Sequence, residues 1–363
     1  STDTPLLLFW SLSLLFLLIS LRENSSFISL FVGTFLGFAF LSKYAALYFL
    51  IFFIIWWVVY DRTTFLSIKN MLIILFTSFL IASTNLYWNY LNEFTTINHT
   101  IHNANLKEIV FNYNNVIDFL SSQFFVFGPL LFLIYLLIVI DSFFKDQNLS
   151  LLAMTSLPII ILITVQSFLK IANANWAVTA YIGATLIITY YLTLKRYKIL
   201  RFVFYLGLLC NIGLSIYISN IAISGSFYPL DLKSNPLRKN IGFNDVAIKI
   251  HDTFEEEKIS KIIFEKRGDI SRFNYYLNRD NNKFEGKIFI KTNNQLAGNY
   301  YEKNFNYDLI NKTKGEKILI VKIVPDITEN NYELNEIKLI KIITTKTVKN
   351  LKRTYYLYVG KIR

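Results

Sequence analysis

Long hydrophobic runs separated by short polar segments fill the first 223 residues, whereas residues 224–363 are predominantly polar. Most runs reach the roughly 17–25 residues that an α-helix needs to cross about 30 Å of hydrocarbon. A helix satisfies its backbone hydrogen bonds within one segment, so the pattern favours membrane spans over a buried core. We therefore expect a polytopic α-helical membrane protein with about eight spans. The runs are 5–21, 27–41, 44–60, 71–88, 119–140, 149–169, 176–194 and 199–223.

The polar part, 224–363, shows the alternating pattern of a small α/β domain. Helical spacing of apolar residues predicts helices at 244–257 and 269–277. Strands alternating with helices favour a small sheet flanked by helices. The expected organisation is thus a transmembrane domain at 1–223 followed by a soluble α/β domain at 224–363. Short runs rich in Ile, Val and Tyr predict strands at 261–265, 287–291, 317–324, 339–345 and 354–359.

Composition supports a membrane location: 53% of residues are hydrophobic, and the chain has 33 Phe and 23 Tyr. The formal net charge of +12 is concentrated in the polar part, which holds 26 basic and 17 acidic residues from Ser224 onward. A lysine-rich domain beside a bilayer suggests attraction to anionic membrane lipids. The sequence has no recognition motif for DNA or RNA, so we expect no nucleic acid partner. Cys210 is the only cysteine, which excludes a disulfide within the chain.

The short loops predict the orientation, because positive charges accumulate on the cytoplasmic side. One set of span ends carries eight basic residues, and the opposite set carries three. The first set is Arg22, Arg62, Lys69, Lys145, Lys195, Arg196, Lys198 and Arg201; the second is Lys43, Lys107 and Lys170. We therefore expect a multi-pass protein of the bacterial inner (cytoplasmic) membrane, with Ser1 and the 224–363 domain on the periplasmic side.

Two charged residues on the expected outer face are candidates for chemistry. Asp3 precedes Pro5 at the start of the first run and fits either a helix N-cap or an active-site carboxylate. Lys43 lies between two apolar runs, where an ammonium group either snorkels to the interface or meets an anion such as a phosphate.

The outer loop at 88–118 is rich in His and Asn. His99 and His102 share one face if the segment is helical, with Asn103 and Asn105 close in sequence. These side chains suit sugar hydroxyls or a phosphate, a solvated loop is an equal alternative, and a metal site lacks a third ligand with diagnostic spacing. In the short turn at 170–176, Asn175 fits either turn chemistry or hydrogen bonds to a ligand.

Taken in order, several segments resemble the bacterial branch of the GT-C glycosyltransferases. These are the family-39, PMT-like enzymes, which include the aminoarabinose transferase of lipid A. The segments are DTPLLLFW (3–10), GTFLGFAFLSKYAAL (33–47), LYWN (86–89), HTIHNANL (99–106), FGPLLFL (127–133), ANANWAVTAYIGA (172–184) and NPLRKNIGF (235–243).

The resemblance implies transfer of a sugar from a polyprenyl-phosphate donor to a lipid, glycan or protein acceptor on the outer face of the membrane. It makes Asp3 the catalytic carboxylate of this chain and Lys43 a residue facing the donor phosphate. Substrate contacts are then expected from His99, His102, Asn103, Asn105 and Asn175. Some family members use a divalent metal ion, so such an ion is a possible cofactor here.

Full members of the family have about a dozen spans, with a further catalytic Asp in the first external loop. The sequence therefore suggests a C-terminal portion lacking the first spans, active only as part of a longer chain. The alternative is a non-catalytic remnant, or a transport or scaffold protein. A transporter should carry ionisable residues at mid-membrane, and the runs listed above show none there.

Overall fold

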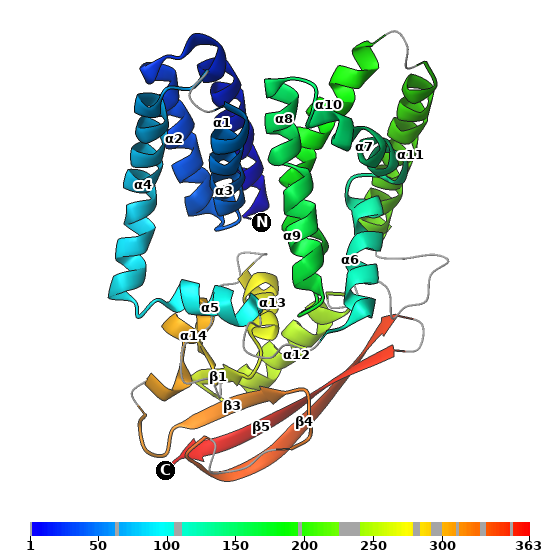
Figure 1. The fold of residues 1–363 in the computed structure, drawn as a ribbon. Helices are drawn as coiled ribbons and strands as arrows, with labels where there is room; N and C mark the ends of the chain where they lie inside the picture. The colour runs from blue at the N-terminus through cyan, green and yellow to red at the C-terminus, as the bar shows by residue number, and fades with distance from the viewer. Residues whose placement is uncertain are drawn as a thin grey trace. The chain divides into compact units, whose positions relative to one another are not determined.

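The structure is a computed structural model that describes residues 2–61, 65–104, 111–194, 198–224, 240–278, 284–291, 300–309, 312–326, 332–348 and 351–363. It divides into two compact units, Ser1–Ser215 and Ile216–Arg363 (Figure 1).

The first unit is helical, and each of the eight apolar runs forms helix. The run at 44–60 ends in a π-helical turn, and the helix that forms the last run continues into the second unit. The elements are α1 (Asp3–Glu23), α2 (Ser26–Ser42), α3 (Ala46–Trp56), η1 (Trp57–Asp61), α4 (Ile68–Leu91), α5 (Thr95–Ala104), α6 (Tyr113–Val126), α7 (Pro129–Ser142), α8 (Gln147–Met154), α9 (Leu157–Ser167), η2 (Ala174–Ala177), α10 (Ala180–Thr193) and α11 (Lys198–Ser224).

Helices α1 to α4 lie side by side (Figure 1). Close approach of α2 and α4 depends on small residues. A Cβ atom added at Gly33 would lie 1.8 Å from the Thr77 hydroxyl, and one at Gly37 would lie 2.7 Å from Ile81. Large side chains such as Trp10, Phe49, Phe53 and Trp56 are fully buried in this unit. The unit therefore has a well-packed interior of its own.

The expected count of about eight spans is not confirmed. By length and hydropathy, four helical segments in the described residues can cross a membrane: α1, α4, α8 with α9, and α11. The run at 119–140 does not form one straight span, because α6 and α7 meet at an angle of 105°. Gly128 at the bend has a φ of 101°, and Pro129 begins the next helix. Counting this bent pair as one span raises the number to five.

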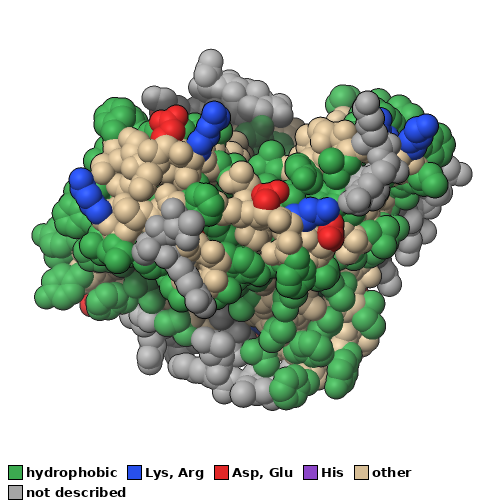
Figure 2. Space-filling view, turned by 45° about the horizontal axis from the view of Figure 1, so that its top comes forward, with side chains coloured by type: hydrophobic (Ala, Val, Ile, Leu, Met, Phe, Trp, Pro, Cys, Tyr) green, Lys and Arg blue, Asp and Glu red, His purple; other side chains and the backbone are tan. Residues whose placement is uncertain are grey.

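Many large hydrophobic side chains of the helices are exposed, including Phe76, Leu137, Phe202 and Leu209. On the face shown in Figure 2, hydrophobic and uncharged side chains cover most of the surface and charged side chains are few. Exposure of apolar patches of this extent to water is unfavourable, whereas their contact with lipid chains is not. The surface is that of a membrane protein.

The second unit contains a mixed sheet with strand order β2-β1-β3-β5-β4. Strands β2, β1 and β3 are parallel, and β5 pairs antiparallel with both β3 and β4. The five predicted strands and the two predicted helices are all present, which confirms the small α/β domain. The elements are α12 (Phe243–Glu256), β1 (Lys261–Phe264), α13 (Arg267–Asn278), β2 (Lys287–Ile290), α14 (Tyr300–Asn304), η4 (Tyr307–Leu309), β3 (Lys317–Lys322), β4 (Leu334–Val348) and β5 (Leu351–Ile362).

Alternation along the strands separates two hydrophobic cores. Ile262 and Phe264 of β1 face α12 and α13, which cover one side of the sheet (Figure 1). Ile263 points to the other side, where it packs near Tyr307 and Tyr332. Successive strand residues point to opposite faces, so β1, in which all four residues are buried, is covered on both sides.

Candidate functional site

Three of the residues selected from the sequence meet in the first unit. The Lys43 ammonium lies 2.6 Å from Oδ1 of Asp3, and the Asn175 amide donates to Oδ2 of the same carboxylate at 2.6 Å. The three side chains come from the start of α1, the turn between α2 and α3, and the short helix η2. The structure therefore brings together residues that are 40 and 172 positions apart in sequence. We call this group the Asp3 cluster.

Backbone geometry places Lys43 at this position. Lys43 is the C-cap of α2, and its extended conformation, with a φ of −164°, ends the helix. Its carbonyl then accepts the N–H of Ala46 at 3.1 Å, where α3 begins. The side chain is 27% exposed and that of Asp3 is 18% exposed, so the pair is shielded but reaches solvent. An ammonium has three donors, which leaves Lys43 the capacity to hold a second anion.

Asp3 lies in the first turn of α1 rather than at its N-cap, which is Thr2. A carboxylate there is stabilised by the positive end of the helix dipole. Both carboxylate oxygens also bond to side chains of distant elements, so the residue does more than begin a helix. Asp3 is therefore not the N-cap of α1, and its role as an active-site carboxylate stays a prediction.

The turn that carries Asn175 is held by a buried glutamine. The Gln123 amide donates to the carbonyl of Ala174 at 3.3 Å, and its oxygen accepts the hydroxyl of Tyr181 at 2.7 Å. Gln123 is fully buried and sits on α6. This bond fixes the backbone next to Asn175, which allows the exposed Asn175 amide to meet Asp3 in one geometry.

A second polar network starts at the residue next to Lys43. The Tyr44 hydroxyl donates to Oδ1 of Asn85 at 2.8 Å and accepts from the Asn89 amide at 3.1 Å. The Thr96 hydroxyl at the start of α5 donates to the side-chain oxygen Oδ1 of Asn89. Asn89 is fully buried. The network ties the Lys43 turn to the end of α4 and the beginning of α5. Sequence reasoning assigned no role to it, although the i, i+4 spacing of Asn85 and Asn89 on one helix face is a usable signal.

The structure does not test the predicted substrate contacts of the His and Asn residues in the loop at 88–118. His99, His102 and Asn103 belong to α5, but their side chains lie outside the described part of the structure, as does Asn105 altogether. Among the described residues, no group of three or more His, Cys, Asp or Glu side chains could hold a metal ion.

Part of the chain is similar to known proteins. Residues 1–88 match the family of dolichyl-phosphate-mannose-protein mannosyltransferases. The lipid A galacturonosyltransferase RgtD of Rhizobium johnstonii is 30% identical over 203 residues, which is 55% of this chain and 43% of that protein. The chain thus spans less than half the length of this curated relative. No solved structure matches the chain.

The family match covers Asp3, Lys43, Tyr44 and Asn85, but it ends before Asn89 and Asn175. Two of the three residues of the Asp3 cluster thus lie in the matched segment. The resemblance expected from the sequence is confirmed: this chain is similar to the PMT-like glycosyltransferases of the GT-C class.

Proposed function

We propose that this chain transfers a sugar from a polyprenyl-phosphate donor to a lipid, glycan or protein acceptor at the outer face of the bacterial inner membrane. The observation that carries the proposal is the Asp3 cluster, in which a carboxylate, an ammonium and an amide meet at helix ends. Two of these groups lie in the segment that matches a glycosyltransferase family.

In this proposal Lys43 binds the donor phosphate. A phosphate near the Asp3 cluster competes with Asp3 for the ammonium, and a charge-assisted hydrogen bond to phosphate is favourable in a partly shielded site. The isoprenoid tail then lies against the exposed apolar helix surfaces. The role is consistent with the position of Lys43 in a turn, because an ammonium there reaches the membrane interface without crossing the hydrocarbon.

Asp3 acts on the acceptor in the same scheme. Once the phosphate engages Lys43, Oδ1 of Asp3 accepts a hydrogen bond from the acceptor hydroxyl and takes its proton as the hydroxyl oxygen attacks the anomeric carbon. The polyprenyl phosphate leaves with the electrons of the broken bond. Such general-base assistance is typically worth about 10²–10⁴-fold in rate. Asn175 orients the carboxylate through Oδ2. No step of the scheme uses a metal ion.

The test measures transfer from a radiolabelled polyprenyl-phosphate sugar by membranes that contain the full-length protein. We expect Asp3→Asn to lower kcat about 100-fold or more, because the amide cannot take a proton. Lys43→Gln should mainly raise KM for the donor, with part of the affinity restored in Lys43→Arg. Glu23→Gln, at the opposite end of α1, is the matched control and should leave both constants unchanged.

Two results would contradict the proposal in different ways. Full activity of Asp3→Asn would remove Asp3 from catalysis while leaving sugar transfer intact. Absence of transfer by the unaltered full-length protein from every polyprenyl-phosphate sugar supplied would reject the function itself.

A further inference from the structure

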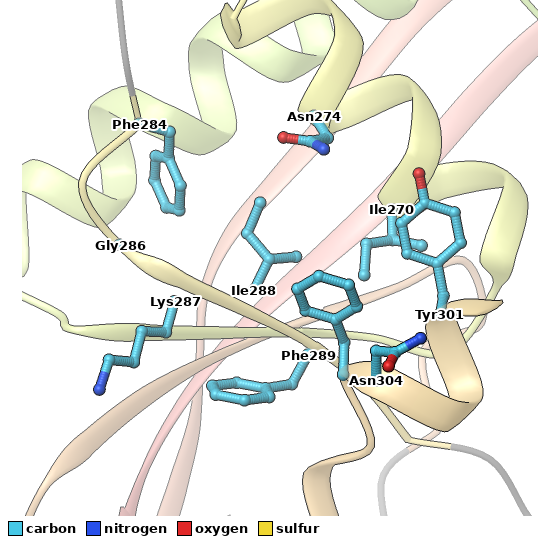
Figure 3. Close-up of a pocket in the computed structure, with 10 residues that line it drawn as sticks. Ile270, Asn274, Phe284, Gly286, Lys287, Ile288, Phe289, Tyr301 and Asn304 are labelled. Carbon is cyan, nitrogen blue, oxygen red and sulfur yellow. The ribbon is translucent and has the colours of Figure 1, made fainter.

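A pocket of about 610 Å³ opens in the second unit between α13, β2 and α14 (Figure 3). Its volume lies in the range of about 300–1,000 Å³ that is usual for small-molecule sites. Asn274 of α13 and Tyr301 and Asn304 of α14 supply polar groups. The rings of Phe284 and Phe305 supply apolar walls. The residues that line the pocket belong to the second unit, whereas the Asp3 cluster belongs to the first unit.

Packing fixes the wall on the side of Phe284. This ring lies 4.7 Å from the ring of Phe254 and 5.3 Å from that of Phe273, measured between centroids. A Cβ atom at Gly286 would come within 2.3 Å of the Phe254 ring and 2.4 Å of the Phe284 ring. A side chain at Gly286, where the chain enters β2 next to Phe284, would therefore force these rings to shift (Figure 3).

The opposite wall is attached to the edge of the sheet. Strand β2 is an outer strand, and the N–H of Ile290 donates to the carbonyl of Phe305 at 2.8 Å. This bond holds the end of α14 beside β2 and keeps Tyr301, Asn304 and Phe305 at the pocket. The site is thus built from regular elements, as a preorganised binding site requires.

The chemistry of the lining selects a neutral ligand rich in hydroxyl groups. An amide side chain offers two donors and an acceptor, and the Tyr301 hydroxyl offers both functions. Of the described lining residues, Lys287 alone is charged, and its ammonium lies away from Asn274, Asn304 and Tyr301 in Figure 3. The described lining residues offer a phosphate a single cation. They offer a metal ion no carboxylate or histidine ligand. An apolar chain could not form hydrogen bonds with the side-chain amides of Asn274 and Asn304.

We propose that this pocket binds a sugar residue of a glycan. The apolar face of a pyranose ring packs against Phe284 or Phe305, and its hydroxyls exchange hydrogen bonds with Asn274, Asn304 and Tyr301. The inference goes beyond the proposed transfer, because it concerns binding at a different site of the chain. It can fail while the transferase proposal stands, and the reverse also holds.

Saturation-transfer NMR on the full-length protein tests the proposal, with methyl β-galactoside, methyl N-acetyl-β-glucosaminide and galacturonic acid as probes. A zwitterionic detergent is needed, since the sugar headgroups of glycosidic detergents would compete. We expect saturation of the ring protons of at least one probe. The double variant Asn274→Ala/Asn304→Ala should weaken binding about tenfold or more, as loss of one or two hydrogen bonds predicts. Asn335→Ala on β4, the opposite edge strand, is the matched control and should bind normally.

Further variants keep the result interpretable. Gly286→Ala must displace the Phe284 ring and should also weaken binding, while circular dichroism checks that each variant is folded. Since the lining selects a neutral sugar, galacturonic acid should bind more weakly than the two methyl glycosides, and Lys287→Gln should leave binding of the neutral sugars unaffected. Absence of binding for all probes, or binding unchanged in the folded double variant, would overturn the proposal.

Discussion

Carboxylates of this chain are stabilised in different ways, according to the groups that face them. Asp3 meets an ammonium and an amide at a helix start. Asp61 is fully buried and accepts the N–H groups of Phe65 and Leu66 at 2.9 and 3.0 Å, which links the end of η1 to the residues before α4. Glu316 bonds to the ammonium of Lys261 at 2.6 Å in the second unit. Exposure does not separate Asp3 from Glu316, since their side chains are 18% and 21% exposed.

Glu316 gives a prediction for stability in acid. Burial alone would raise the pKa of its carboxyl, but hydrogen bonds from Lys261 and Ser260 outweigh burial and lower the pKa. The stabilisation is therefore complete above the unfolded pKa of about 4.3 and is lost as pH falls through the lower folded value. We expect Glu316→Gln to reduce the free energy of unfolding by about 1 kcal/mol at pH 7, as loss of such a bond predicts.

Chemical denaturation followed by circular dichroism measures this effect. The difference between Glu316→Gln and the unaltered protein should shrink in strongly acidic solution, where the wild-type carboxyl is also protonated. The exposed Glu285→Gln serves as the control. A difference that stays constant from neutral to strongly acidic pH would show that the carboxylate charge is not responsible.

The sequence identified Asp3, Lys43 and Asn175 as candidates but not their contact. Counting span ends predicts that all three lie on one side of the membrane, because successive spans run in opposite directions and alternate span ends share a side. Lateral packing decides which helix ends become neighbours, and hydropathy carries no information about it. The Tyr44 network was missed for a related reason. Polar groups at helix ends usually face water, whereas Asn89 is buried and accepts a hydrogen bond from Thr96 of α5.

At the scale of elements, the strands were easier to predict than the spans. The parallel strands β1, β2 and β3 are short runs that their own apolar residues mark. The predicted runs covered only the middle of the longer strands β4 and β5. A hydropathy average over 119–140 cannot reveal a bend of 105°, because both arms are equally apolar. The Gly128-Pro129 pair is the local signal, since proline favours a first helical turn and glycine permits a positive φ.

The positive φ at this bend predicts that Gly128→Ala and Gly213→Ala differ in their effect on thermal stability. Gly128→Ala places a Cβ atom 2.1 Å from Oδ1 of Asn211 and forces alanine to a φ of 101°. Strain of this kind costs about 1–3 kcal/mol, so the midpoint of thermal unfolding in detergent should fall. Gly213→Ala in α11 is the matched control. It meets nothing within 4 Å and should be neutral or slightly stabilising, because alanine is the better helix former. Equal midpoints for the two variants would contradict the strain at the bend.

At the scale of the whole molecule, the second unit has two hydrophobic cores on its sheet, formed by its own residues. We therefore expect a fragment of residues 240–363 to be soluble and folded without the helical unit. Circular dichroism should show mixed α/β structure, and thermal unfolding should be cooperative, as for a small single domain. An aggregated or unfolded fragment would show that this unit depends on the rest of the chain. A fragment that starts at Phe243 lacks Asn240, whose side chain accepts from Arg272, and tests how much this bond contributes.

The division into two units also determines which spectroscopic signals each unit provides. All five tryptophans, Trp10, Trp56, Trp57, Trp88 and Trp176, belong to the helical unit, whereas the second unit contains tyrosines but no tryptophan. Selectively excited indole emission therefore reports on the helical unit alone. Trp176 directly follows Asn175, so its emission is a built-in probe of the Asp3 cluster. A sugar that binds only between α13 and α14 has no indole beside it in its own unit, and a single tryptophan introduced there would make the two sites optically distinguishable.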